Sequence, residues 1–392
     1  MSERADTVVI GAGSTGTAAA WQLARLGAGR ILLLESGAVG TGTTGRSCAI
    51  LRMHYMHEPL ARMALHSRRV YESFDELVGG RRSFRAVGWM FLARPEDAEP
   101  LAANVAMQQG VGVETCLLDP VEAAELVPGM QVADVGAVAW EAGSGYTDPR
   151  SSAEGFLGAA TRLGAQYRPG VEVHRLEPRR GGWRVETGSG PVDAGTVLVA
   201  AGLRTVDLVR PLGVTLPVEP VRHTVAVLDR PPDFGPEHPV ISDRVVGSYY
   251  RPEAGGRTLV GATGAYEGVI DPETDLDRPA PRDVVATFTG RFAQRFPAVT
   301  ETVVADSYTS IYDCTPDLQP LLGPLPGIDN LHVAVGFSGH GFKLAPALGE
   351  LLAEKIVGGR TSLVDIDLFR PSRFEEGATF VAPHPYSVPT LG

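Results

Sequence analysis

The stretch from residue 7 to residue 35 constrains the fold of this chain most strongly. An apolar run at 7–10 is followed at once by the turn GAGSTG at 11–16, a helix-forming stretch at 17–26 and a second apolar run at 31–34 that ends on Glu35. This order of strand, glycine turn, helix, strand and acid is typical of a dinucleotide-binding βαβ unit. Because the flanking elements all agree, the pattern favours a dinucleotide site over an ordinary glycine turn.

Each part of this stretch has a physical role in such a site. Gly11 permits the tight turn off the strand, Gly13 lets a pyrophosphate approach the backbone, and Gly16 lets helix and strand pack closely. The helix N-terminus offers free N–H groups and the positive end of its dipole to phosphates. Glu35 can accept hydrogen bonds from a ribose. The candidate cofactor-binding residues here are Gly11, Gly13, Ser14, Thr15, Gly16, Glu35 and Ser36.

The composition argues against several kinds of partner. The chain has 392 residues and a formal net charge of −11, which argues against nucleic acid or an anionic membrane surface. Cys48, Cys116 and Cys314 are far apart and form no CxxC, which is typical of a reducing cytoplasm, and we expect no signal peptide or membrane span. His54 and His57 lack an evident third ligand, so no metal site is predicted.

Hydrophobic periodicity along the chain predicts two interleaved units. Signals typical of α/β structure lie at the start, middle and end, and segments with the alternation of antiparallel strands lie between them. We predict an α/β fold in which a Rossmann-like domain holds an inserted, mainly antiparallel β substrate domain (α+β). The predicted limits are 1–83, 147–217 and 305–392 for the first domain, and 84–146 and 218–304 for the second.

Several single elements are also predicted. Apolar spacing indicates a helix over 58–77, an apolar aromatic run indicates a strand over 84–94, and a helix is expected over 342–357. The apolar strand at 196–202 ends in Ala201 and Gly202, small residues that let a ligand approach the backbone. The proline-containing tail from residue 371 is expected to be irregular.

Four stretches give the chain a resemblance to a known family. They are VIGAGSTG at 9–16, TGRSCAILRMHY at 44–55, VLVAAG at 197–202, and TPD at 315–317 followed by GFSGHGFK at 336–343. With these motifs the chain resembles the FAD-dependent amine and amino-acid oxidoreductases, the D-amino-acid oxidase-like group that includes sarcosine oxidase and glycine oxidase. The resemblance extends over nearly the whole chain and implies FAD in the Rossmann-like domain.

The resemblance also implies how FAD lies. The adenosine end would lie on the first glycine turn and Glu35, with Val173 beside the adenine; the loop from Thr43 would follow the pyrophosphate and flavin, and the motif ending at Lys343 would lie against the flavin ring. The residues implied in addition to the first turn are Thr43, Thr44, Gly45, Arg46, Ser47, Val173, Ala201, Gly202, Gly339, Gly341, Phe342 and Lys343.

Departures from the family pattern bear on cofactor attachment and on the electron acceptor. Ser310 stands where the family carries a flavin-attaching cysteine, and no histidine replaces Arg46 or Ser47, so FAD is expected to be non-covalent. Val260 stands where the family has an oxygen-activating lysine, and Gly264 where it has a histidine. The acceptor is therefore left open between oxygen and a dye-like or quinone-like carrier.

The same resemblance implies a substrate clamp. Arg52 and Lys343 match the residues that bind a substrate carboxylate, and a bidentate guanidinium with an ammonium suits that task. The composition adds an independent hint, because Lys343 is one of only two lysines among 35 basic residues. His340 and Tyr312 match substrate-site positions. Tyr249 and Tyr250 both lie near a further family tyrosine, so the choice between them stays open, with Tyr250 taken as the candidate.

The resemblance implies the reaction as well. It is FAD-dependent oxidation of the C–N bond of a small amino acid or N-alkyl amino acid, by hydride transfer to flavin, giving an imine that hydrolyses. Two alternatives stay open: oxidation of a 2-hydroxy acid, which the same clamp would hold, and a non-catalytic flavin-binding partner or assembly subunit, against which intact Arg52 and Lys343 argue. The expected partner is a small carboxylate-bearing amine, and the oligomeric state is left open.

Overall fold

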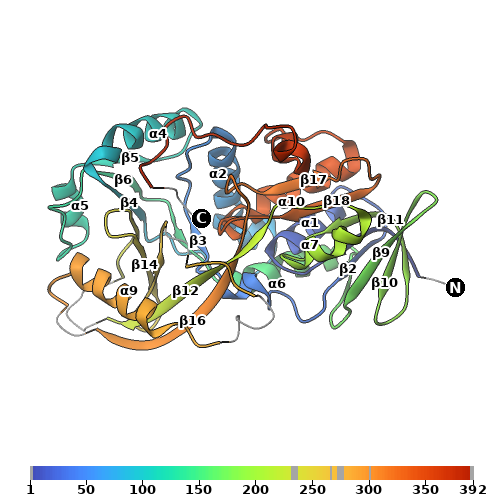
Figure 1. Cartoon of the computed structure of the whole chain (residues 1–392), viewed down its shortest axis with the longest axis horizontal. Helices are drawn as coiled ribbons and strands as arrows, with labels where there is room; N and C mark the ends of the chain where they lie inside the picture. The colour runs from blue at the N-terminus through green and yellow to red at the C-terminus, as the bar shows by residue number, and fades with distance from the viewer. Residues whose placement is uncertain (1–2, 231–236, 265–266, 272–277, 300–301, 389–392) are drawn as a thin grey trace.

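Two large β-sheets organise the chain, which a computed structural model describes over residues 3–230, 237–264, 267–271, 278–299 and 302–388. Figure 1 shows the first sheet in the half of the molecule that holds the N-terminus, and the second in the half that holds α5 and α9. Among the described residues, no helix has both the length and the apolar character needed to cross a membrane.

The first sheet contains the βαβ unit predicted from residues 7–35. β1 pairs in parallel with β2 and β11, and β11 pairs in parallel with β18. Central parallel strands are buried on both faces, which explains their nearly continuous apolar sequences. The strands of this sheet are β1 (Glu3–Ile10), β2 (Ile31–Leu34), β8 (Gln166–Arg168), β9 (Val173–Arg179), β10 (Gly182–Thr187), β11 (Val192–Val199), β17 (Leu321–Pro324) and β18 (Leu331–Val335).

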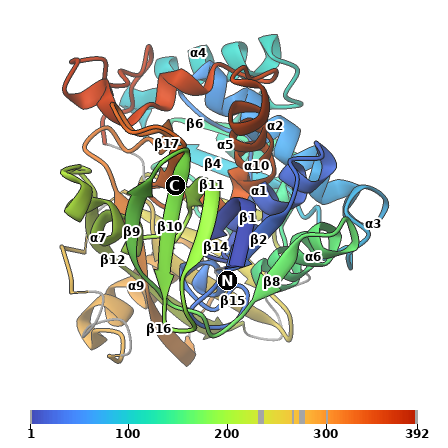
Figure 2. The same cartoon turned by 90° about the vertical axis from the view of Figure 1, so that its right-hand side faces the viewer.

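Alternate side chains of these strands form two apolar clusters. Val9 and Leu33 belong to the cluster on the helical face, whereas Val8 and Leu32 pack with β9, β10 and α7 (Arg204–Val209) on the other face. Figure 2 shows β1 and β2 between α7, β9 and β10 on one side and the helices of the first face on the other. The helices of the first face are α1 (Ser14–Arg25), α2 (Glu58–Glu72), α6 (Pro149–Arg162) and α10 (Gly341–Gly358).

One glycine allows α10 to approach α1 closely. A Cβ at Gly349 would lie 2.6 Å from the carbonyl carbon of Ala18, so any larger residue would push the two helices apart. The close packing fixes α10 beside the glycine turn, and it thereby fixes the first turn of α10, which carries Lys343.

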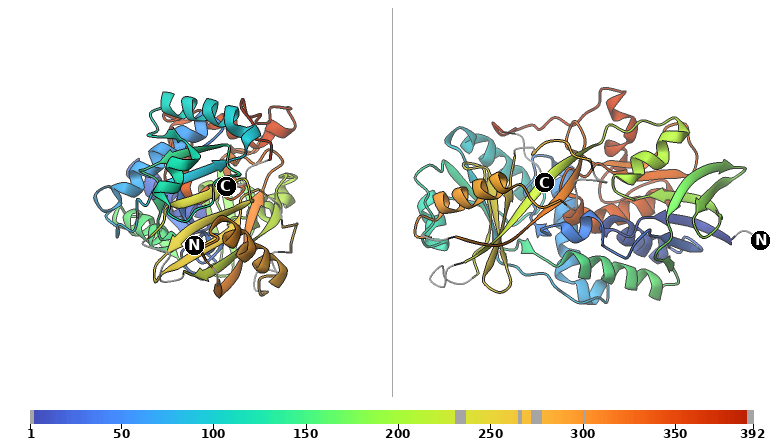
Figure 3. Two further views of the ribbon diagram at one scale, coloured as in Figure 1. Left: turned by 90° about the vertical axis from the view of Figure 1, so that its left-hand side faces the viewer. Right: turned by 60° about the horizontal axis from the view of Figure 1, so that its bottom comes forward.

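The second sheet is mainly antiparallel, as predicted. Its order is β16-β12-β15-β14-β13-β4-β6-β5, and of these neighbouring pairs only β13 and β4 run parallel. Figure 3 shows α9 (Arg282–Arg295) lying against this sheet. The strands are β4 (Trp89–Ala93), β5 (Cys116–Leu118), β6 (Ala137–Glu141), β12 (Glu219–Asp229), β13 (Val240–Asp243), β14 (Ser248–Glu253), β15 (Arg257–Ala262) and β16 (Val303–Cys314).

The remaining elements include two helices, a short strand pair and several 3₁₀ turns. α4 (Ala98–Gly110) and α5 (Pro120–Leu126) lie between strands of the second sheet in sequence. β3 (Ile50–Leu51) and β7 (Gly145–Tyr146) form a separate antiparallel pair. Short 3₁₀ turns complete the chain at η1 (Thr43–Arg46), η2 (Pro95–Asp97), η3 (Arg210–Leu212), η5 (Ile366–Phe369) and η6 (Pro371–Phe374).

Two single-element predictions differ from the structure, and one strand was not predicted. The helix predicted at 58–77 is interrupted at Ser73 and continues as the short α3 (Phe74–Leu77), where the Phe74 ring packs at 5.1 Å against Phe156. The strand predicted at 84–94 is limited to β4. The strand β16 was not predicted, because its first residues are exposed and polar residues interrupt its apolar pattern.

β16 also bears on the predicted domain limits. It pairs with β12 from Val303 to Cys314, so the chain leaves the second sheet after Cys314 rather than after residue 304. Residues 305–314, which were predicted in the first domain, therefore belong to a strand of the second sheet. The domain limits themselves stay a prediction.

Candidate active site

The glycine turn after β1 is shaped by contacts with the backbone around it. Gly11 has φ +102°, and a Cβ there would overlap the carbonyl oxygen of Ala200 at the end of β11. A Cβ at Gly16 would overlap the carbonyl oxygen of Gly11. By contrast, a Cβ at Gly13 would meet, within 4 Å, only Thr44 Oγ1 among the described residues. Gly11 and Gly16 therefore shape the turn, while Gly13 leaves room for a ligand beside the backbone.

Glu35 is fixed beside this turn. Its carboxylate accepts hydrogen bonds from the backbone N–H of Ala12 (2.7 Å) and of Gly37 (2.8 Å). α1 begins at Ser14 next to this turn, and the Ser14 backbone N–H donates to Thr44 Oγ1 (3.0 Å). The glycine turn, the helix N-terminus and the Glu35 carboxylate together fit a dinucleotide, which agrees with the sequence prediction.

One cavity of about 660 Å³ extends from this turn to the second sheet. It brings together most of the predicted residues from seven separate stretches of the chain. The predicted residues that line it are Gly11, Gly13, Ser14, Thr15, Glu35, Ser36, Thr43, Thr44, Arg46, Ser47, Arg52, Val173, Ala201, Gly202, Tyr312, Gly339, His340, Gly341, Phe342 and Lys343.

Three predicted residues lie outside this lining. Gly16 and Gly45 act through packing, since a Cβ at Gly45 would lie 2.5 Å from the carbonyl oxygen of Gly40. Tyr250 is a correction: it is fully buried against Phe292 and Phe296 of the α9 region, and its hydroxyl donates to the carbonyl of Arg291 (3.1 Å).

Tyr249, not Tyr250, faces the cavity, because neighbouring residues of a strand point to opposite faces of the sheet. The same alternation bears on Val260, which was expected where the family carries an oxygen-activating lysine. Val260 is fully buried in the cluster that contains Tyr250, so it faces away from the cavity. The next residue of β15, Gly261, faces the other way. Because it has no side chain, the Tyr249 ring can occupy the space beside it.

The two predicted clamp residues meet in the part of the cavity nearest the second sheet. Lys343 lies in the first turn of α10 and is 7% exposed. The Arg52 guanidinium lies over the rings of Tyr55 (4.8 Å) and Trp89 (5.7 Å) and donates to the carbonyl of His54. Burial, assisted by the nearby Arg52 charge, holds the pKa of Lys343 well below its usual range. A bound anion would restore the charge of this lysine.

A buried carboxyl group supports the turn that carries Arg52. Glu141 is fully buried at the end of β6 and accepts a hydrogen bond from the backbone N–H of Met53 (2.9 Å). Burial raises the pKa of Glu141, although the nearby Arg52 charge acts in the opposite direction. Because Met53 follows Arg52 directly, this bond fixes where the guanidinium projects.

His340 is a neutral hydrogen-bonding group at the cavity. It is 4% exposed, and its Nε2 lies 2.9 Å from the carbonyl oxygen of Leu318. Burial and the adjacent Lys343 lower the pKa of His340 to about 3. At neutral pH its Nε2 therefore donates to that carbonyl, and the residue neither carries charge nor competes with the clamp for an anion.

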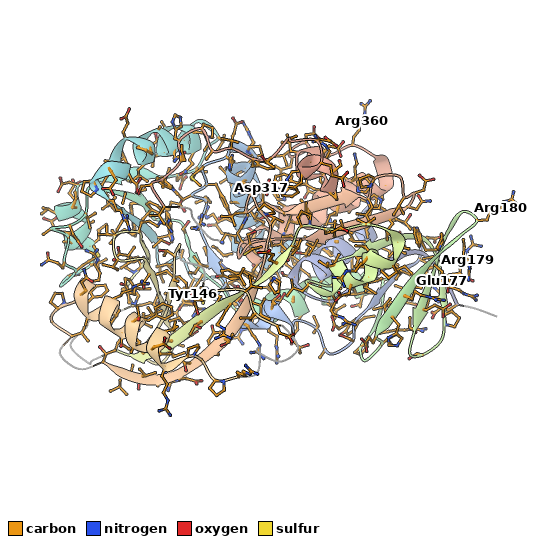
Figure 4. All side chains as sticks on the ribbon, in the orientation of Figure 1. Tyr146, Glu177, Arg179, Arg180, Asp317 and Arg360 are labelled. Carbon is orange, nitrogen blue, oxygen red and sulfur yellow. The ribbon has the colours of Figure 1, made fainter. Side chains whose placement is uncertain are left out.

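The Thr-Pro-Asp motif fixes the loop that His340 contacts. Asp317 forms a buried, bidentate ion pair with Arg373, with Nε–Oδ2 and Nη2–Oδ1 distances of 2.8 Å. Figure 4 shows Asp317 within the molecule, while Arg180 and Arg360 project from its edge. Asp317 also accepts from the backbone N–H of Gln319 (3.1 Å), so the motif has a structural role beneath the cavity.

Cys48 and His223, which the sequence analysis did not predict as site residues, form a hydrogen-bonded group with Tyr249 in the same cavity. The Tyr249 hydroxyl lies 3.0 Å from Cys48 Sγ and 2.9 Å from His223 Nε2. The His223 ring stacks on Tyr312 at 4.3 Å. Burial lowers the pKa of His223 to about 3 and raises the pKa of Tyr249. His223 could have been found from its place in the strand pattern at 221–227, where inward and outward residues alternate.

The distal part of the cavity was also missed. Its lining residues come from five separate segments, and they include Trp89, Phe91, His54, Arg244, Thr263 and Tyr386. Tyr386 lies in the tail, where no local pattern marked it. No group of three or more metal-ligating side chains gathers anywhere in the described residues.

Comparisons with known proteins agree with this arrangement. The family model described as "DAO: FAD dependent oxidoreductase" matches residues 6–355. Monomeric sarcosine oxidase of Streptomyces avermitilis is 30% identical over 390 residues, which cover 95% of this chain and 98% of that protein. The crystal structure of L-proline dehydrogenase from P. horikoshii is similar with a TM-score of 0.87 and 28% identity, covering 96% of this chain and 99% of that one.

One relative is much longer than this chain. Mitochondrial dimethylglycine dehydrogenase of Rattus norvegicus is 26% identical over 401 residues, which cover 96% of this chain and 46% of that protein. The chain therefore spans about half the length of that relative.

Proposed function

Because the chain belongs to the family of FAD-dependent oxidoreductases, we propose that it oxidises the C–N bond of a small amino acid or N-alkyl amino acid. The substrate would lose a hydride from carbon and a proton from nitrogen, and the resulting imine would be hydrolysed by water. FAD, when bound, takes up the electron pair. The observation that carries the proposal is that Arg52 and Lys343, from distant segments, line the same cavity as the glycine turn.

The two cations suit a carboxylate-bearing amine. A carboxylate between Arg52 and Lys343 would pair with both charges and would raise the lowered pKa of Lys343. The same positive surroundings disfavour an ammonium group on the substrate, so the amine would bind neutral and no strong general base is needed. Neutral His340 and the hydroxyls of Tyr249 and Tyr312 would then position the amine by hydrogen bonds.

An anaerobic bleaching screen tests the proposal. The FAD-loaded protein is mixed without oxygen with amino acids, N-methyl amino acids and 2-hydroxy acids, and the flavin absorbance is followed. We expect bleaching by an amino or N-alkyl amino acid and none by the matching hydroxy acid. Bleaching by hydroxy acids alone would make the protein a 2-hydroxy-acid oxidoreductase, and no bleaching by any of them would favour a non-catalytic flavin-binding subunit.

We also propose that FAD is held without a covalent bond. Ser310 lines the cavity at the position where a flavin-attaching cysteine is expected from the family resemblance, while Cys314 is 5% exposed and lies outside the lining. Acid precipitation should therefore release the yellow colour into the supernatant. Colour that stays with the pellet would contradict this, and loss of that colour in Cys48→Ser would then identify the attachment site, because Cys48 does line the cavity.

A further inference from the structure

The C-terminal strap, which we define as residues 380–388, crosses from one half of the molecule to the other. It begins beside the Thr-Pro-Asp loop, where the backbone N–H of Phe380 donates to Asp317 Oδ2 (3.2 Å). It ends at the second sheet, where Arg244 Nη2 donates to the carbonyl of Val388 (2.8 Å). Figure 1 shows this dark red segment passing α4 before it reaches the end of the chain.

Buried polar side chains hold the strap in place. The Asp97 carboxylate, 4% exposed, accepts hydrogen bonds from the backbone N–H (2.7 Å) and the hydroxyl (2.9 Å) of Ser387. Asn104 of α4, which is fully buried, donates to the carbonyl of His384 (2.9 Å). Two independent attachments on either side of residues 385 and 386 fix this part of the strap, and hydrogen bonds to a buried carboxylate are among the stronger ones.

Tyr386 projects from the fixed part of the strap into the cavity. Its ring lies 5.0 Å from the ring of Phe91, and its hydroxyl lies 2.6 Å from His54 Nε2. His54 in turn packs against Phe91 (4.9 Å) and Trp89 (5.4 Å). Burial lowers the pKa of His54 to about 3, so the contact between His54 and Tyr386 is uncharged at neutral pH.

The clamp residue Arg52 connects this aromatic wall to the substrate. Its guanidinium lies 5.7 Å from the ring of Trp89, which belongs to the same wall. A substrate whose carboxylate pairs with Arg52 therefore has the ring of Tyr386 within the same enclosed space. We propose that Tyr386, held by the strap, closes the distal end of the substrate cavity and limits the length of the side chain or N-substituent that the enzyme accepts.

This inference rests on the proposed function, because it assumes a carboxylate held by Arg52. A substrate of the wild-type enzyme would then be a small amino acid. In an apolar pocket, two substrates that differ by one methylene group differ in kcat/KM by about 10- to 200-fold, so a closed pocket end would strongly disfavour longer ones. Tyr386 acts here as a specificity-determining residue, and the carboxylate clamp and the FAD site lie outside its contacts.

Carboxylate probes of increasing length test the inference directly. Acetate, butanoate and phenylacetate are titrated into the FAD-loaded enzyme, and binding is followed by the change in flavin absorbance. We expect wild type to bind acetate more tightly than phenylacetate, and Tyr386→Ala to raise the affinity for phenylacetate relative to acetate by about tenfold or more. Tyr386→Phe keeps the ring and should keep the wild-type order. Val381→Ala is the matched control in the same strap, because Val381 is 81% exposed.

The outcomes separate this inference from the proposed function. An unchanged ratio of affinities in Tyr386→Ala, with flavin retained, would overturn the role of Tyr386 and leave the proposed reaction intact. Failure of every carboxylate to bind wild type would instead contradict the clamp itself. If Tyr386→Ala loses its flavin, Tyr386→Leu replaces it in the same titration, with the same expected shift and the same contrary result.

Discussion

The two ends of the cavity are built on different principles. The dinucleotide end uses consecutive residues: the turn at 11–16 supplies backbone donors, and Glu35 follows on the next strand. The substrate end uses side chains from separate segments, such as Arg52, which lies hundreds of residues before Lys343 and Tyr386 in the sequence. The first end therefore depends on local backbone shape, and the second depends on how the two sheets and the strap are packed.

The ends also differ in their electrostatics. At the dinucleotide end the acid Glu35 is paired with backbone N–H groups. At the substrate end, ionisable groups are buried, and burial lowers the pKa of Lys343, His54 and His223. Changes of backbone shape should therefore abolish cofactor binding, whereas changes of charge or pH should act on the substrate end. Four predictions test this contrast.

The largest effect is expected from Gly11→Ala. The new methyl group would overlap the carbonyl oxygen of Ala200, and the residue would keep a φ of +102° that alanine rarely adopts. We expect loss of bound flavin, measured as the flavin-to-protein ratio after purification. Gly27→Ala is the matched control: Gly27 also has positive φ (+67°), but a Cβ there would meet no atom of the described residues within 4 Å, so strain acts without a clash. Normal flavin content in Gly11→Ala would refute the close-contact argument.

A smaller effect, confined to the substrate end, is expected when either clamp residue is removed. Arg52→Ala and Lys343→Met should each lower kcat/KM, mainly through KM, because each loses a charged hydrogen bond worth about 2–5 kcal/mol. This corresponds to roughly 30-fold to several-thousand-fold. Flavin content should stay normal.

The second lysine supplies the control for this comparison. Lys355 forms an ion pair with Asp367 (2.7 Å), and it does not line the cavity. Lys355→Met should therefore leave steady-state kinetics within about twofold of wild type, as expected for a weak, partly exposed ion pair. Equal kinetics in all three variants would show that Arg52 and Lys343 do not bind the substrate carboxylate.

Mild acid should destabilise the fold through its buried histidines. The pKa values of His54, His223 and His340 are lowered to about 3 by burial, so the unfolded chain binds more protons below pH 6.5. Stability should fall as pH decreases from 6.5, by up to about 1.4 kcal/mol per pH unit for each histidine, and this loss should level off near pH 3. Burial raises the pKa of Asp313 to about 6, so this carboxyl group takes up its proton more readily in the folded chain. Its contribution to stability therefore increases as pH falls and offsets that of one histidine.

Urea unfolding at pH 7.5, 6.5, 5.5 and 4.5 measures this dependence. His223→Gln should reduce the slope of the unfolding free energy against pH by about the contribution of one histidine, because glutamine does not titrate. His174, which is exposed on β9, gives the control His174→Gln, which should leave the slope unchanged. A flat stability profile between pH 7.5 and 5 would show that these histidines can take up protons in the folded state.

The smallest effect is proton uptake when a carboxylate binds. Burial lowers the pKa of free Lys343, and a paired carboxylate should raise it again. Between the two pKa values binding takes up one proton, so the Kd for acetate should rise about tenfold per pH unit as pH increases through that window. Calorimetry in buffers of different ionisation enthalpy measures the uptake. Lys343→Met should show none, and a wild type without uptake would mean that Lys343 is already charged before binding.

Much of the dinucleotide end was predictable from the sequence, and the family findings confirm FAD. The reason is that glycine spacing dictates backbone shape within a few residues, and the acid lies on the next strand of the same unit. The resemblance also selected Arg52 and Lys343, which do line one cavity. Gly16 was predicted to let helix and strand pack closely, and its contacts agree with this prediction. Gly45 was expected along the cofactor but acts through packing, which is also a local effect of a missing side chain.

The rest was decided by tertiary structure. Sequence alone could not choose between Tyr249 and Tyr250, because the choice depends on which face of β14 is covered by α9. The register that turns Val260 away from the cavity has the same origin. Tyr386 reaches the cavity only because Asp97 and Asn104 hold a tail without regular structure across both halves of the molecule. Backbone shape is a property of neighbouring residues, whereas a pocket wall is a property of whatever the packing brings together.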